Sequence, residues 1–207
     1  MSKYDFRFYY WEKTTPDAPY LRQPFGDKWE VYTWKEVGQM ARKLATDLQS
    51  LGLPSRSHIG LVSKNCREWI IADLAIGMAG YVNVPFYPTL KAAAVKELIE
   101  LGDVKALFAG KLDDWGGMKA GVPADLPLIR FPHYEGAAQI KEGEEWFDFI
   151  NQFKPLQGEP SPGLSDIWTI IFTFGTTGTP KGVVLPCLLY TSPSPRDATL
   201  SRMPSSA

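Results

Sequence analysis

The stretch HIGLVSKNCREWIIADLAIGMAGYVNVPF, residues 58–86, decides the fold class of this chain. Residues 58–63 are a short apolar run typical of a buried strand, and residues 67–80 are apolar almost all round, as in a helix packed under other elements. Residues 82–86 are the next strand. A strand, a helix and a second strand in this order predict a right-handed crossover between two parallel strands.

The same alternation continues downstream. KAAAVKELIEL, residues 91–101, has the spacing of an amphipathic helix that Gly102 ends, and VKALFAG, residues 104–110, is again a strand. Helices of this length between short strands rich in Val, Ile and Leu require a sheet covered on both faces. The chain is therefore predicted to be an α/β protein, with a parallel sheet flanked by helices.

Upstream of this unit, residues 33–52 predict a helix. Thr33 and Glu36 have the spacing of a capping box, the apolar residues that follow fall on one helical stripe, and Gly52 supplies a left-handed stop. The aromatic residues between Phe6 and Trp11 predict an N-terminal segment that docks on the core.

Further downstream the pattern is less regular. Residues 111–143 predict loops, with one strand at 127–131 and one short helix at most. EEWFDFINQF, residues 144–153, predicts a helix, and DIWTIIFTF, residues 166–174, a strand rich in β-branched and aromatic residues.

Composition excludes several classes of protein. The chain has 207 residues, 22 of them basic and 23 acidic, so its net charge of −1 gives no reason to expect nucleic acid as a partner. Two cysteines are too few for a disulfide framework or a zinc site, which favours a reducing compartment. No signal peptide and no apolar run long enough for a transmembrane segment is evident, so we expect a cytoplasmic protein for which peripheral membrane contact stays open.

One loop has the composition of a binding site. The strand at 166–174 leads directly into GTTGTPKG, residues 175–182, and then into the apolar run Val183 to Leu185. Glycines let backbone N–H groups approach an anion, threonine hydroxyls donate without adding charge, and Lys181 adds a positive charge. Lys181 is followed by glycine rather than Ser or Thr, so this is not a Walker loop. The residues alone leave two interpretations open, a polyphosphate cradle or a plain hairpin.

The segment TFGTTGTPKGVV, residues 173–184, resembles the phosphate-binding signature of the adenylate-forming superfamily, which includes acyl-CoA synthetases, luciferases and peptide-synthetase adenylation domains. Upstream segments at 32–37, 44–53, 63–69 and 78–90 match in order and spacing, and the opening residues resemble long-chain fatty-acid–CoA ligases most. The resemblance covers about residues 8–186, and it places them in the large N-terminal domain of such a ligase.

This resemblance implies a two-step reaction, in which ATP activates a carboxylic acid as an acyl-adenylate and coenzyme A then captures the acyl group. The substrates are therefore expected to be ATP, a fatty acid and coenzyme A, with Mg²⁺ as the metal. No residue of this chain is assigned as catalytic or as a metal ligand. The residues implied in binding the ATP phosphates are Thr173, Gly175, Thr176, Thr177, Gly178, Thr179 and Lys181.

Two features depart from the pattern of the superfamily. Phe174 stands where a serine is usual, which removes a hydroxyl donor and puts a ring at the lip of the loop. Residues 187–207, in which 8 of 21 are Ser or Pro, resemble translated adaptor sequence and are predicted to be disordered. Nothing matches the adenine-binding segment or the C-terminal domain with its catalytic lysine, so we expect negligible ligase activity from these 207 residues alone.

Two alternatives remain beside the acyl-CoA ligase. One is a non-catalytic nucleotide-binding or interaction module, and the other is a different adenylate-forming enzyme, such as a peptide-synthetase adenylation domain. His58, His133 and Cys66 are interpreted as packed or surface residues, and the acidic groups at 113–114 and 142–145 as solvated or helix-capping charges.

Overall fold

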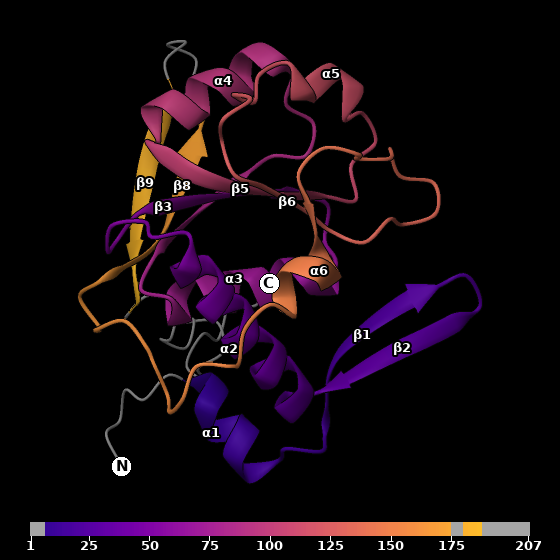
Figure 1. Cartoon of the computed structure of the whole chain (residues 1–207), viewed down its shortest axis with the longest axis vertical. Helices are drawn as coiled ribbons and strands as arrows, with labels where there is room; N and C mark the ends of the chain where they lie inside the picture. The colour runs from indigo at the N-terminus through magenta and orange to yellow at the C-terminus, as the bar shows by residue number, and fades with distance from the viewer. Residues whose placement is uncertain (1–6, 175–179, 188–207) are drawn as a thin grey trace, which may run out of the picture.

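A computed structural model of the chain describes residues 7–174 and 180–187. Its elements follow the strand and helix alternation that the sequence predicts, with one additional hairpin near the N-terminus (Figure 1). In chain order they are α1 (Arg7–Thr14), β1 (Pro19–Phe25), β2 (Lys28–Thr33), α2 (Trp34–Ser50), β3 (His58–Ser63), α3 (Arg67–Met78), β4 (Val82–Phe86), α4 (Ala92–Leu101), β5 (Val104–Gly110), α5 (Gly116–Lys119), β6 (Leu128–Arg130), β7 (Glu144–Glu145), α6 (Trp146–Ile150), β8 (Ile167–Thr173) and β9 (Lys181–Pro186).

The main sheet has seven strands in the order β7-β6-β5-β3-β4-β8-β9. Neighbouring strands are parallel from β7 to β8, as expected, whereas β9 runs antiparallel to β8. The sheet is therefore mixed rather than purely parallel. The reason is chain length, because residues 174–180 are too few for the crossover of a dozen or more residues that a parallel neighbour requires.

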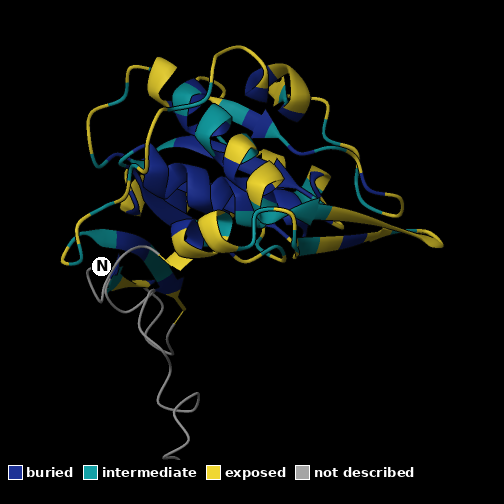
Figure 2. Cartoon of the chain, turned by 90° about the horizontal axis from the view of Figure 1, so that it is seen from below, coloured by how far each residue is buried: buried dark blue, intermediate teal, exposed yellow. Residues whose placement is uncertain are grey.

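Helices cover both faces of this sheet (Figure 1). Buried side chains of α1, α2, α3 and α6 form one core cluster with β3, β5 and β6, and those of α4 and α5 form a second cluster with β4 and β5 on the other face. The helix α3 is buried almost all round, because α2 covers the side that it turns away from the sheet. Figure 2 shows this central layer of buried residues.

Local sequence signals explain where the helices begin and end. The hydroxyl of Thr33 accepts the N–H of Glu36, and the Glu36 carboxylate accepts the N–H of Thr33, so the predicted capping box starts α2. Gly52 lies just beyond this helix at φ +66°, the left-handed conformation expected of a glycine stop. At the N-terminus, the buried rings of Phe8 and Tyr9 dock α1 on the core, as predicted, whereas Tyr10 and Trp11 are exposed and Phe6 lies outside the described residues.

A hairpin formed by β1 and β2 is absent from the sequence prediction. It projects from the body of the protein and carries an exposed tip (Figure 2). A turn signal is present, because the dipeptide Gly26-Asp27 lies between Phe25 and Lys28, which pair across the turn, and Gly26 adopts φ +56°. The flanking residues alternate poorly between apolar and polar, so periodicity by itself does not predict these two strands.

Two predicted elements are shorter than expected. The helix at 144–153 is divided into the two-residue strand β7 and the short α6, because Glu145 accepts the N–H groups of Phe147 and Asp148 and so starts the helix later. The strand at 127–131 is present as β6, and α5 is the one short helix expected between 111 and 143.

Candidate functional site

The predicted phosphate loop connects β8 to β9 at the carboxyl edge of the sheet. Thr173 ends β8, Lys181 begins β9, and the two residues are paired across the ladder. The Thr173 hydroxyl donates to the carbonyl oxygen of Lys181 at 3.4 Å, so it lies at the mouth of the loop. The other predicted phosphate contacts, Gly175, Thr176, Thr177, Gly178 and Thr179, lie outside the described residues. Their role stays a prediction.

Lys181 carries a positive charge that the described part of the chain leaves available. Its residue is exposed, and no carboxylate in the described ranges lies within 4 Å of its ammonium group. Phe174, on the other side of the loop, is 43% exposed, so its ring does lie at the lip rather than in the core. Pro180, the first described residue after the loop, is buried. The two ends of the loop therefore present a hydroxyl, a ring and an ammonium group that pairs with no carboxylate of the described residues.

The position of the loop in the fold fits a binding site. Because β3, β4, β5 and β8 are parallel, their carboxyl ends meet at the same edge of the sheet. In open α/β sheets this edge is where ligands bind. Both interpretations of the loop from sequence are thus compatible with the structure, since β8 and β9 form an antiparallel hairpin whose loop opens onto that edge.

Most of the side chains that we interpreted from the sequence as structural rather than catalytic make hydrogen bonds or ion pairs, or are buried. The Nδ1 atom of His58 lies 2.6 Å from the Gly102 carbonyl oxygen, and burial raises the pKa of the Cys66 thiol to about 11. Asp113 pairs with Lys64, and Asp114 pairs with Lys91 and accepts the N–H of Gly117 at the start of α5.

Glu142 accepts from the indole N–H of Trp115 and from Lys119, and these bonds lower its pKa to about 2. Among the described residues, no group of three His, Cys, Asp or Glu side chains could hold a metal ion.

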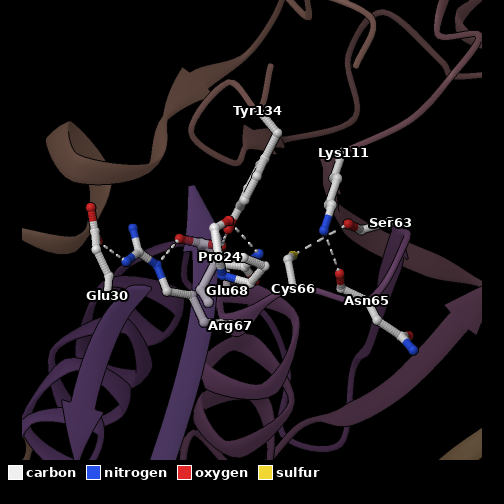
Figure 3. Close-up of polar contacts among 10 residues, drawn as sticks. Pro24, Glu30, Ser63, Asn65, Cys66, Arg67, Glu68, Lys111 and Tyr134 are labelled. Carbon is white, nitrogen blue, oxygen red and sulfur yellow. Dashed lines mark hydrogen bonds and ion pairs between the residues drawn. The ribbon is translucent and has the colours of Figure 1, made fainter. Parts of the chain in front are cut away.

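A second cluster of polar side chains, which sequence reasoning missed, lies at the carboxyl ends of β3 and β5 (Figure 3). The guanidinium of Arg67 donates to Glu68 at 2.7 Å and to Glu30 on the hairpin. Glu68 also accepts from the hydroxyl of Tyr134, and burial together with the negative charge of Glu68 raises the pKa of that tyrosine. These residues are up to about a hundred positions apart in the sequence, so only the tertiary structure shows that they meet.

Comparison with known proteins identifies the family. The sequence model for the AMP-binding enzyme family matches residues 8–188. The chain belongs to this family. In Mus musculus the long-chain-fatty-acid–CoA ligase ACSBG2 is 29% identical over 181 residues, which are 81% of this chain and 26% of that protein. Long chain acyl-CoA synthetase 5 of Arabidopsis thaliana is 32% identical over 164 residues, 74% of this chain and 24% of that protein.

Solved structures agree on the AMP-binding fold. Acetoacetyl-CoA synthetase from Streptomyces lividans superposes with a TM-score of 0.72 at 21% identity, covering 86% of this chain and 29% of that one. The anthranilate CoA ligase AuaEII, solved with anthranoyl-AMP, gives a TM-score of 0.68 at 18% identity and covers 85% and 33%. The chain spans about a quarter of the length of the AMP-binding relatives from Mus musculus and Arabidopsis thaliana.

Proposed function

We propose that this chain contributes the phosphate-binding part of an ATP-dependent acid–thiol ligase, which converts a long-chain fatty acid to its acyl-adenylate and then to acyl-CoA. Membership of the AMP-binding family supports the activation of an acid by ATP. The choice of fatty acid and coenzyme A rests on relatives that are named long-chain acyl-CoA synthetases or ligases. The observation that carries the proposal is the pairing of Thr173 with Lys181 at the mouth of the loop.

The role proposed for the loop is electrostatic. When the carboxylate attacks the α-phosphate, negative charge develops on the departing pyrophosphate, and positioned donors lower the free energy of that state. Lys181 would supply the positive charge, and Thr173 a hydroxyl once it exchanges its long bond to the Lys181 carbonyl for a phosphate oxygen. The backbone N–H groups of residues 175–179 would complete the cradle.

The described residues fit Mg²⁺ only as a companion of the nucleotide. Thr173 offers one hydroxyl oxygen at the mouth of the loop, and no described carboxylate lies within 4 Å of Lys181. Mg²⁺ in nucleotide sites is held largely by substrate phosphates and water, so a loop without carboxylates suits it in that form. When bound, the metal would help to neutralise the phosphate charge.

The direct test is the affinity of the 207-residue chain for MgATP and for pyrophosphate, measured by isothermal titration calorimetry. We expect Lys181→Ala to weaken pyrophosphate binding about tenfold, the effect of losing one charge-assisted contact of roughly 1.4 kcal/mol. Lys154→Ala is the matched control, because Lys154 is an exposed lysine of the connector to β8. Equal affinities of Lys181→Ala and the unmodified chain would contradict the cradle assignment.

A second test separates the acyl-CoA ligase from its alternatives. In the full-length gene product, exchange of labelled pyrophosphate into ATP that depends on palmitate, followed by palmitoyl-CoA formation, is the expected result. Exchange that depends on an amino acid would indicate a peptide-synthetase adenylation domain, and no exchange with any acid would indicate a non-catalytic module. For the 207 residues alone we expect negligible formation of acyl-CoA, because they span so little of the relatives' length.

The boundary between the domain and the predicted tail at residue 187, and the cellular location of the protein, also remain proposals. Cys187, the first residue of the predicted tail, is buried and its N–H donates to the Asp166 carbonyl, whereas residues 188–207 lie outside the described residues. None of the described helices is long and apolar enough to cross a membrane. We propose a cytoplasmic location, with peripheral membrane contact still open, and no nucleic-acid partner. Fractionating cells that express the full-length protein would show whether it is found in the cytoplasmic or in the membrane fraction.

A further inference from the structure

A hollow of about 530 Å³ lies between the β1–β2 hairpin, the start of α3 and the residue that follows β5. We refer to it as the hairpin hollow. It is separate from the phosphate loop, because β3 and β4 lie between β5 and β8 in the sheet. The residues on which the argument depends are Arg22, Gln23, Trp29, Arg67, Trp69 and Lys111, all of which line it. Its volume lies in the range of small-molecule sites.

The position of the hairpin hollow is one that open α/β sheets use for binding. The helix after β3 leads to β4 on one side, whereas the chain after β5 leads to β6 on the other side. The carboxyl ends of β3 and β5 therefore diverge, and such a switch point leaves a crevice at the edge of the sheet. Asn65 and Lys111 follow these two strands and line the hollow.

The charge of the hollow is positive. Of the described residues that line it, none is acidic and three are basic, Arg22, Arg67 and Lys111. Arg67 pairs with two carboxylates, Glu30 and Glu68, so these three groups together carry one net negative charge, and the guanidinium packs 4.6 Å from the ring centroid of Tyr32. Arg67 therefore has no positive charge left for a ligand. Arg22 and Lys111 supply the positive charge of the hollow and exceed the one negative charge of the Arg67 cluster.

Lys111 is the cation best placed to meet a ligand. It adopts φ +46°, an unfavourable backbone conformation for a lysine, at the point where β5 ends. Its ammonium group donates to the carbonyl oxygen of Asn65 at 2.9 Å and lies 4.9 Å from the centroid of the Tyr134 ring (Figure 3). Within the described ranges no carboxylate lies within 4 Å of it, in contrast to Lys64, which pairs with Asp113 at 2.5 Å.

Neutral polar groups complete the lining. Gln23 is only 6% exposed, and its amide nitrogen has a long bond of 3.3 Å to the carbonyl oxygen of Pro24. Cys66, the N-cap of α3, lines the hollow, so the positive end of this twelve-residue helix faces the same region. Burial keeps the Cys66 thiol neutral by raising its pKa to about 11, so it brings no negative charge.

We propose that the hairpin hollow binds a small aromatic anion, with its carboxylate or sulfonate at Lys111 and its ring against Trp29 and Trp69. Lys111 offers an ammonium group with donors to spare, and an anion there would gain a charge-assisted hydrogen bond. The two indoles supply flat apolar walls, and Trp29 is 64% exposed, which leaves its surface free to contact a ring. The proposal does not depend on the ligase function.

The test is a titration of the ¹⁵N-labelled 207-residue chain with 1-naphthalenesulfonate, followed through the indole N–H resonances in two-dimensional NMR spectra. Trp29→Phe and Trp69→Phe assign the two resonances. The neutral compound 1-naphthalenemethanol measures the contribution of the ring alone. Lys111→Met removes the charge and keeps an unbranched stem, Lys111→Arg retains the charge, and Lys64→Met is the matched control at the neighbouring strand end.

The expected result is saturable movement of the Trp29 and Trp69 resonances, with the sulfonate binding at least fivefold more tightly than the alcohol. Lys111→Met should weaken sulfonate binding about tenfold and leave binding of the alcohol unchanged, whereas Lys111→Arg and Lys64→Met should bind the sulfonate as the unmodified chain does. Equal binding of the two compounds to the unmodified chain would overturn the proposal, even if Lys111→Met does not fold. Undiminished sulfonate binding by folded Lys111→Met would also overturn it.

Discussion

The indole N–H of Trp168 on β8 donates to the carboxylate of Asp73 on α3, with Nε1 3.1 Å from Oδ1. The same carboxylate oxygen accepts from the side-chain amide of Asn83 on β4, at 2.7 Å. The Trp168 ring packs against Gly77, where a Cβ would lie 2.5 Å from the ring atom Cη2. One buried carboxylate thus connects α3 to the strand that carries the predicted phosphate loop.

We expect Trp168→Phe to destabilise the protein by about 2 kcal/mol, because it removes a donor from a buried carboxylate as well as apolar contacts. Trp29→Phe is the matched control, since Trp29 is 64% exposed, and it should change the free energy of unfolding by less than about 0.5 kcal/mol. Urea unfolding followed by circular dichroism measures both. Equal effects of the two substitutions would show that the contact between Trp168 and Asp73 contributes little to stability.

Thr33→Ala should cost about 1 kcal/mol, because the hydroxyl that caps the N–H of Glu36 is lost from the start of α2. Bonds from Thr33 lower the pKa of Glu36 below its ordinary value of 4.5. The capping contribution of Glu36 is therefore fully present above pH 4.5 and is lost as the pH falls through the lowered folded-state pKa.

The measurement for this second prediction is unfolding by urea at pH 7 and at pH 3. The difference in stability between Thr33→Ala and the unmodified chain should shrink as the pH is lowered, because the substitution also removes the hydroxyl bond to the Glu36 carboxylate, which protonation of Glu36 weakens in the unmodified chain. Thr14→Ala is a suitable control, because its hydroxyl bonds to the carbonyl oxygen one turn earlier in α1. A difference that stays constant with pH would contradict the reciprocal capping interaction.

Asp47→Asn should stabilise the protein above neutral pH. Asp47 is fully buried on α2, and neither carboxylate oxygen has a hydrogen-bond partner of good geometry among the described residues. Burial raises its pKa to about 6, and Glu144 adds to this rise, whereas the approaching N–H of Phe153 and the charge of Lys43 offset part of it. The carboxylate form is therefore the costly one in the folded state.

The sign of the pH dependence follows from this raised pKa. The pKa of Asp47 is 3.8 in the unfolded chain and about 6 in the folded chain. The free energy of unfolding therefore falls as the pH rises between these values, and this loss is complete above pH 6. We expect Asp47→Asn to gain roughly 2 kcal/mol at pH 8 and little at pH 3.5. Thermal melts at the two pH values check this, and a gain at pH 3.5 as large as at pH 8 would exclude titration of Asp47 as its cause.

Phe174→Ser should strengthen pyrophosphate binding three- to tenfold, because it restores a hydroxyl donor at the lip of the loop and removes a ring. Since Phe174 is 43% exposed, the substitution should leave stability within about 0.5 kcal/mol. Phe147→Ser, at an equally exposed phenylalanine on α6, is the control for both measurements. Unchanged or weaker binding by Phe174→Ser would show that the ring does not hinder the loop. This prediction rests on the proposed function.

The local sequence pattern was sufficient to predict most helices and strands of the domain. The strands β3, β4 and β5 begin and end where the apolar runs do, and Thr33 and Gly52 mark the start and stop of α2, because caps and periodicity depend on residues a few positions apart. The phosphate loop was also recognisable, since its glycines, threonines and lysine are contiguous. The β1–β2 hairpin was missed, because its strands have no clear alternation of their own and pack against α2, α3 and the side chain of Arg67, which are distant in sequence.

The amino-acid sequence by itself determined the alternation of strands and helices, the family and the loop that carries Thr173 and Lys181, because all of these are written in contiguous residues. Only the tertiary structure decided that β9 turns back beside β8 and that Asp73 meets Trp168. It also decided that Lys111 comes to lie beside Asn65. The physical reason is that these relationships depend on strand order and on crossovers between distant segments, and burial of two core faces selects that order.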